Sequence, residues 1–147
     1  MVSNDPLLQP FQLRHLTLKN RIMSTSHTML FSVDGAPQQR YQLYHEEKAR
    51  GGIALTMFGG SSAVAPDSAT ASGVVNLTSD SIIPHFQQFA GRIHKYDCAL
   101  MCQITHLGRR ATTRTWDWLP VTAPSRSREI GGDFPRIMDR DDINRIV

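Results

Sequence analysis

The spacing of apolar residues predicts strands and helices that alternate along most of the chain. Residues 11–18 alternate apolar and polar side chains, which is typical of a short hairpin, and residues 22–27 read as a second short strand. The stretch 53–58 is almost entirely apolar and lies between two glycine pairs, as expected for a strand covered on both faces in a parallel sheet. Residues 99–106, again mostly apolar, predict a further strand.

A helix is predicted before the apolar stretch 53–58, over about residues 38–50. Tyr41, Tyr44 and the aliphatic part of Lys48 fall on one face of this helix, and acidic residues lie on its surface. A glycine pair directly after it supplies the stop, because glycine readily adopts the left-handed conformation in which helices commonly end.

Two more helices follow. One is predicted from a cap at Asp80 or Ser81 to about Tyr96, since apolar residues recur within it at spacings of three and four. The other begins after an acidic capping signal at residues 139–142, and the chain ends about two turns into it, at Val147. We therefore expect a chain truncated within a helix rather than a complete small fold.

This order of elements predicts an α/β fold. Strand, helix, strand, helix, strand requires right-handed crossovers and a parallel sheet. Two architectures satisfy it, a doubly wound sheet and the first part of a (β/α)8 barrel. Glycine-rich dinucleotide, P-loop and nucleophile-elbow motifs do not occur, so a Rossmann or P-loop function is unsupported.

Composition narrows the class of protein. Of the 147 residues, 40% are hydrophobic and 20% charged, which are values of a globular chain rather than a disordered or membrane protein. We see no secretory signal and no apolar run long enough for a membrane helix, so a cytoplasmic location is expected. Arginines gather within residues 108–128, where they favour solvent or a small anionic ligand over nucleic acid.

The cysteines and histidines do not predict a disulfide or a metal site. Cys98 and Cys102 are four positions apart at the start of one strand, which separates their Cα atoms by roughly 13 Å, too far for a disulfide. His27 and His106 each close a strand, and their placement relative to the cysteines does not match metal-ligand spacing. A lone histidine of this kind is more often structural than catalytic.

Candidate functional residues lie at the carboxyl ends of the strands, where parallel α/β folds place their sites. The pair Gly59-Gly60 would let a planar ligand approach the backbone closely, although a tight turn explains it as well. The amide of Gln103, in an otherwise apolar strand, suits the edge of a flavin or base but equally a structural role. Trp116 and Trp118 could cover a ligand or pack at the mouth of a barrel.

Several motifs, in the same order, resemble the Old Yellow Enzyme superfamily of FMN-dependent oxidoreductases. The strand end Ser26-His27-Thr28 is most similar to the branch that holds 2,4-dienoyl-CoA reductase, trimethylamine dehydrogenase and N-methylproline demethylase-like proteins. The run from Tyr44 to Ser62 is most similar to the amine-demethylating members. The matching segments are residues 7–11, 16–22, 44–52, 59–60, 103–110 and 123–125.

The resemblance implies that residues 1–147 are the N-terminal portion of a single FMN-binding domain. That portion would be a hairpin and the first three β/α units of an incomplete (β/α)8 TIM barrel. The family's catalytic residues, and the cysteines of a 4Fe-4S cluster where one exists, would lie beyond Val147, so this chain alone should be inactive. The resemblance implies a small-molecule substrate and a homo-oligomer of the full-length protein, while the histidine and cysteine spacing assigns no metal ligand within the chain.

The same resemblance implies a cofactor site. Thr25, Ser26 and His27 would contact FMN chiefly through backbone groups, Gly59 would flank the flavin, and Gln103 would hydrogen-bond its pyrimidine edge. The implied reaction is hydride transfer through flavin N5, either N-demethylation of a small methylated amine or reduction of an enoate or dienoyl substrate by NAD(P)H. Two other classes remain open, a noncatalytic barrel fragment and a flavin-free barrel of aldolase or isomerase type.

Overall fold

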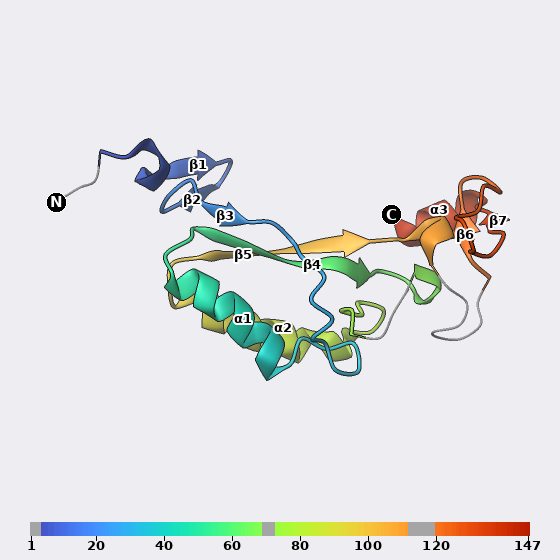
Figure 1. The fold of residues 1–147 in the computed structure, drawn as a ribbon, viewed down its shortest axis with the longest axis horizontal. Helices are drawn as coiled ribbons and strands as arrows, with labels where there is room; N and C mark the ends of the chain where they lie inside the picture. The colour runs from blue at the N-terminus through green and yellow to red at the C-terminus, as the bar shows by residue number, and fades with distance from the viewer. Residues whose placement is uncertain (1–3, 69–72, 112–119) are drawn as a thin grey trace.

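A computed structural model describes residues 4–68, 73–111 and 120–147. Its centre is a three-stranded parallel sheet in the order β3-β4-β5, with one helix in each crossover (Figure 1). Both helices lie on the same face of the sheet and contact each other, while the opposite face carries no helix from the described residues. The elements are β3 (Met23–Ser24), α1 (Gln39–Arg50), β4 (Leu55–Ala63), α2 (Ile83–His94) and β5 (Ala99–Thr105).

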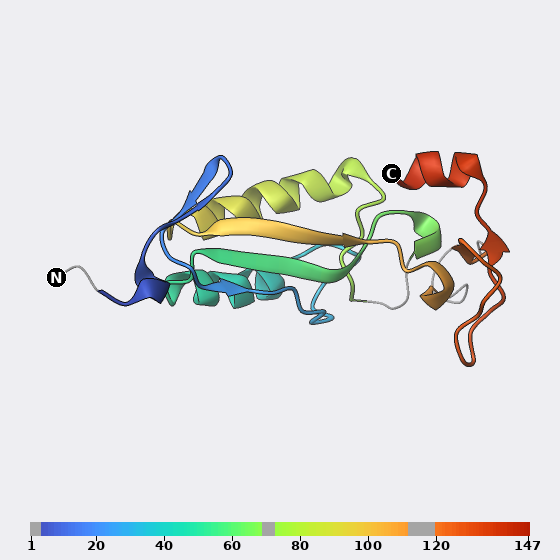
Figure 2. The same cartoon turned by 90° about the horizontal axis from the view of Figure 1, so that it is seen from above.

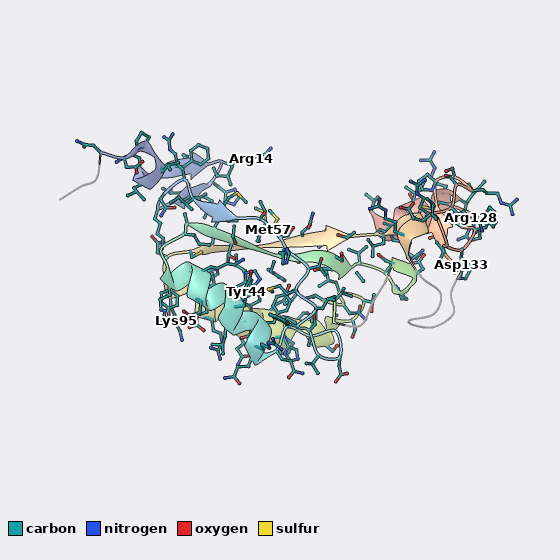
Figure 3. The ribbon with its side chains drawn as sticks, viewed as in Figure 1. Arg14, Tyr44, Met57, Lys95, Arg128 and Asp133 are labelled. Carbon is teal, nitrogen blue, oxygen red and sulfur yellow. The ribbon has the colours of Figure 1, made fainter. Side chains whose placement is uncertain are left out.

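Aromatic side chains fill the layer between the helices and the sheet. Phe58 of β4 is 3% exposed, and its ring centroid lies 5.0 Å from that of Phe89 on α2 and 6.4 Å from that of Tyr41 on α1. Burial of one such ring stabilises the fold by about 1.5–3 kcal/mol. Because side chains alternate along a strand, Met57 points to the face without helices, as Figure 3 shows.

The face of α1 that packs on the sheet differs in part from the predicted one. Tyr41, His45 and Ala49, spaced four residues apart, are buried. Tyr44 is 37% exposed, and the ammonium group of Lys48 lies 4.3 Å from its ring centroid. The prediction was right for Tyr41 and wrong for Tyr44, because it passed over a histidine as a buried residue.

The predicted hairpin is confirmed and covers the amino end of the sheet. Its strands β1 (Phe11–Leu13) and β2 (Leu16–Leu18) pair antiparallel. Leu18 packs against Ala54 and Leu55 at the start of β4. This places the hairpin and the C-terminal helix at opposite ends of the molecule (Figure 2).

Two polar contacts hold the residues after the hairpin to the turns that follow the helices. Lys19 Nζ donates to the Tyr96 carbonyl at 2.5 Å, just beyond α2. Asn20 Nδ2 donates to the Gly52 carbonyl at 2.7 Å, just beyond α1. Gly52 has φ of +100°, so the predicted glycine stop of α1 is confirmed.

Two of the predicted strands have different limits in the structure. The strand expected over residues 22–27 is paired only at Met23–Ser24. The strand expected to end at Phe58 continues through the glycine pair to Ala63, with a register shift between Phe58 and Ser62. The prediction was wrong because it took the end of the apolar run as the end of the strand.

The chain beyond β5 adds a small parallel pair that the sequence did not predict, followed by the predicted C-terminal helix. Asp139 and Asp142 form a capping box at the start of that helix. Earlier in the chain, α2 is preceded by a single 3-10 turn. Ser79 caps this turn, whereas the sequence predicted a cap at Asp80 or Ser81. These elements are β6 (Thr122–Ala123), β7 (Arg136–Ile137) and α3 (Arg140–Ile146), and the 3-10 turns are η1 (Pro6–Leu8), η2 (Pro66–Ser68), η3 (Asp80–Ile82) and η4 (Gly108–Arg110).

Among the described residues, no helix combines the length and the apolar composition that crossing a membrane requires. The cysteines are both free, as expected from their spacing, and burial raises the pKa of the Cys98 and Cys102 thiols. Within the same residues, His, Cys, Asp and Glu side chains form no group of three that could hold a metal ion.

Candidate functional site

The candidate site lies where β3 and β5 reach their carboxyl ends on either side of β4. Cys102 packs into the core beneath the helices, so its neighbour Gln103 faces the side of the sheet without helices. Gln103 is exposed there, and Thr25 and His27, which follow the end of β3, are also exposed. Polar groups are therefore presented on the open face of an otherwise apolar sheet.

Two of the predicted site residues meet directly. The Ser26 hydroxyl donates a hydrogen bond to Oε1 of Gln103, although the residues are 77 positions apart. Ser26 is half-buried and Gln103 exposed. The structure thus joins the ends of β3 and β5 across β4 by one side-chain contact.

Gly59 is required at this point by the packing of two backbones. Its φ is +103°, and a Cβ placed on it would lie 2.6 Å from the carbonyl oxygen of Gln103 and 2.5 Å from Oγ of Ser62. Either distance is shorter than any normal contact, so only glycine lets β4 approach β5 here. The sequence suggested that a ligand could approach the backbone closely at Gly59. On the side where a Cβ would lie, the group that approaches is the backbone of Gln103.

The peptide nitrogen of Gly59 is held from beneath by α1. Its N–H donates to the Tyr41 hydroxyl at 3.0 Å in a buried environment. Burial raises the pKa of Tyr41 to about 12, more than the hydrogen bond from Gly59 lowers it, so the hydroxyl stays protonated at neutral pH. The sequence indicated a buried Tyr41 but not this polar role.

Gly60 and Thr28 hold the loop after β3 against the sheet. Gly60 has φ of +84°, and a Cβ on it would lie 2.8 Å from the Thr28 backbone nitrogen. Thr28 Oγ1 donates to Ser61 Oγ at 3.3 Å. The segment that carries Thr25, Ser26 and His27 is therefore fixed at its far end.

A buried polar chain fixes the near end of the same segment. Ser24 Oγ lies 3.0 Å from Thr56 Oγ1, which in turn lies 2.7 Å from Nδ1 of His45 on α1. Burial, with a smaller effect of the Lys48 charge, lowers the pKa of His45 to about 4. His45 is thus neutral at pH 7, and nothing in the apolar pattern pointed to it.

His106, the other strand-closing histidine, belongs to a structural cluster. Its Nδ1 accepts from the Gly108 N–H at 3.2 Å, and its Nε2 lies 3.5 Å from Asp67 Oδ1. Asp67 also accepts from Thr122 Oγ1 at 2.8 Å and from Arg145. Burial alone would raise the pKa of Asp67, but these hydrogen bonds, with the nearby charges of Arg145 and His106, lower it to about 2.

The arginines after β5 are engaged with acidic and aromatic partners. Arg109 and Arg110 each lie 3.0 Å from a carboxylate oxygen of Glu129. Arg128 stacks over the ring of Phe134, with 4.7 Å from its guanidinium carbon to the ring centroid. These pairings fit the expectation of a solvated surface. The tryptophans considered as a ligand cover, Trp116 and Trp118, and also Arg114, lie outside the described residues.

Comparison with known proteins identifies the family. A family model described as the NADH:flavin oxidoreductase / NADH oxidase family matches residues 6–147. The chain belongs to this family. It is 54% identical over 99% of its length to a multifunctional alkene reductase/demethylase of Caballeronia cordobensis, and 46% identical over 98% of its length to a probable N-methylproline demethylase of Rhizobium meliloti. It spans 22% and 21% of those relatives, about a fifth of their length.

Solved structures of other proteins show the same fold. Morphinone reductase matches 97% of this chain with a TM-score of 0.85 at 21% identity, and the chain spans 42% of that protein. An old yellow enzyme homologue from Zymomonas mobilis matches 95% of the chain with a TM-score of 0.78 at 19% identity. The expected α/β fold and the expected superfamily are both confirmed.

Proposed function

We propose that this chain is the N-terminal portion of a (β/α)8 barrel that binds FMN on the open face of the β3-β4-β5 sheet, at its carboxyl end. Thr25, Ser26, His27, Gly59 and Gln103 would line one side of that site. The contact between Ser26 and Gln103 carries the proposal, because it gathers residues from two separate strands around one exposed amide. Parallel α/β folds place their ligands at this end of their strands.

The chemistry of these groups fits the pyrimidine edge of a flavin, which alternates carbonyl oxygens with an N–H group. Gln103 offers an amide with donors and an acceptor, and the loop after β3 offers hydroxyls and backbone groups. Gly59 lets β4 lie directly against the backbone of Gln103, which brings both strand ends to the same side of the proposed site. When bound, FMN supplies hydride transfer at N5, while the protein orients the ring and tunes it by hydrogen bonds.

For the reaction, we propose oxidative N-demethylation of a small methylated amine. The relatives from Rhizobium meliloti and Chromohalobacter salexigens, the latter 40% identical, carry the names N-methylproline demethylase and N,N-dimethylglycine/sarcosine dehydrogenase. In this chemistry a hydride would pass from the N-methyl carbon to the bound flavin as oxidant, and water would hydrolyse the resulting iminium to formaldehyde and the demethylated amine. Reduction of an activated alkene by NAD(P)H is the second candidate, favoured by the name of the Caballeronia relative.

One experiment separates the two reactions. The full-length protein is purified, its visible spectrum is checked for flavin, and it is mixed without oxygen with sarcosine or N-methylproline, or with NADH. Bleaching of the flavin by the amine, with formaldehyde released, supports demethylation. Bleaching by NADH alone, reversed by cyclohexenone, supports alkene reduction, and a colourless protein that takes up no FMN would exclude both.

Two further parts of the proposal concern the full-length protein. A 4Fe-4S cluster would pass electrons from the flavin to another acceptor, and a homo-oligomer would be the assembled form. Iron and sulfide analysis tests the first. Light scattering on the purified protein tests the second, and it would also distinguish an intact barrel enzyme from a noncatalytic fragment that aggregates.

A further inference from the structure

We propose that the side chain of Ser26 is a positioning residue, which holds the Gln103 amide in place for the flavin. This inference rests on the proposed FMN site. It differs from the backbone contact that the family resemblance implies for Ser26, because here the hydroxyl acts through a second side chain. The basis is the hydrogen bond from Ser26 Oγ to Gln103 Oε1.

The backbone of Gln103 is already fixed, so its side chain is the part that needs restraint. The strand is paired with β4 on one side, and Gly59 packs directly on the Gln103 peptide. The side chain itself is exposed on the open face. A glutamine side chain that is free in solvent loses rotamer freedom when a ligand orders it, which weakens binding. The bond from Ser26 orders the amide before any ligand arrives.

Ser26 can act as a restraint because its own segment is anchored on both sides. Two residues earlier, Ser24 is tied to Thr56 at 3.0 Å. Two residues later, Thr28 is tied to Ser61 at 3.3 Å. The hydroxyl between these anchors therefore has a defined position from which to donate.

The direction of the hydrogen bond defines what Gln103 offers to a ligand. Oε1 accepts the hydrogen bond from the Ser26 hydroxyl, and Nε2 makes no hydrogen bond to the described residues. The amide therefore presents its NH₂ group, which would donate to a carbonyl oxygen of the flavin's pyrimidine ring. Such a donor stabilises the reduced ring more than the oxidised one, because reduction adds negative charge to that edge.

The test uses Ser26→Ala and Ser26→Thr in the full-length protein, with FMN removed and titrated back. Ser26→Ala should raise the Kd for FMN about fivefold, the loss expected for one hydrogen bond, and should make the flavin midpoint potential more negative. Ser26→Thr keeps the hydroxyl and should restore both values. Ser127→Ala is the control, since Ser127 is an exposed serine whose hydroxyl also takes part in one side-chain hydrogen bond, accepting from Arg109 at 3.1 Å.

The decisive comparison repeats Ser26→Ala in a Gln103→Ala background. If Ser26 acts through Gln103, the second substitution should change Kd and potential little once the amide is gone. An equal effect in both backgrounds, or no effect in either, would overturn the inference while leaving FMN binding established. A wild-type protein that does not bind FMN would instead overturn the proposed function, and this inference with it.

Discussion

Asp67 and Arg145 lie 78 positions apart and are joined by two hydrogen bonds, at 3.2 Å from Nη1 and 2.9 Å from Nη2 of the arginine. The Asp67 side chain is 6% exposed, whereas that of Arg145 is 45% exposed. Asp67 follows β4 and Arg145 belongs to α3. The pair thus fastens the C-terminal helix to the carboxyl end of the central sheet.

Replacement of Arg145 should loosen that attachment. In Arg145→Ala the Asp67 carboxylate keeps Thr122 and the nearby His106 but loses its arginine partner. Because the arginine is partly exposed, we expect a loss of about 1 kcal/mol in the free energy of unfolding. Urea denaturation measures it. Arg140→Ala, at an exposed position of the same helix, should change stability by less than about 0.5 kcal/mol. Equal losses in the two variants would contradict the attachment.

A methyl group at Gly59 should be poorly tolerated. Gly59→Ala combines a clash with the Gln103 carbonyl and a left-handed φ, so we expect a loss of at least about 2 kcal/mol in the free energy of unfolding. Gly91→Ala is the control, since Gly91 lies within α2 and its added Cβ meets nothing within 4 Å. That substitution should stabilise the protein by about 0.5–1 kcal/mol. Thermal or urea unfolding distinguishes the two signs.

Removal of the Tyr41 hydroxyl should lower the free energy of unfolding, because the buried Gly59 N–H then has no acceptor. Tyr41→Phe keeps the ring packing but leaves the Gly59 N–H without its acceptor, so a loss of about 1–3 kcal/mol is expected. Tyr44→Phe, on the exposed side of the same helix, should be nearly neutral. A stable Tyr41→Phe protein with wild-type FMN affinity would show that the hydrogen bond has no part in holding β4.

His45 should make the protein sensitive to mild acid. Its pKa is about 4 in the folded chain against 6.5 for an ordinary histidine, so between these values the unfolded state binds the extra proton. The resulting contribution to stability is complete above pH 6.5 and falls as the pH decreases toward 4. In His45→Gln the slope of unfolding free energy against pH should decrease in this window, by at most about 1.4 kcal/mol per pH unit. Identical slopes would contradict a buried neutral histidine.

Much of the fold could be predicted from the sequence because its signals are local. Apolar runs marked the strands, three-and-four spacing marked the helices, and the acidic cap marked α3. The end of β4 was missed because its last residues are small and polar, and they pair through contacts with Thr28 and Gln103 that the local sequence does not show. The two-residue pairing of β6 with β7 is too short to produce a periodic pattern.

The candidate site was predicted only in part. Gln103 was a candidate from its amide in an apolar strand and from the family resemblance, Ser26 came from the resemblance, and the structure shows that they touch. The residues that support them were not found, because Tyr41 and His45 lie on a helix and exert their effect through single hydrogen bonds to the sheet. Residue type and spacing cannot reveal such a bond between distant segments.

The hairpin and its two polar contacts have a consequence for the order in which the chain acquires structure during synthesis. Every partner that closes the amino end of the sheet, from Leu18 to the carbonyl of Tyr96, precedes the end of β5. The carboxyl end, by contrast, gains one of its contacts only from Arg145, near the end of the sequence. A nascent chain can therefore assemble the amino end of the sheet while Arg145, which fastens α3 to the carboxyl end, is still inside the ribosome.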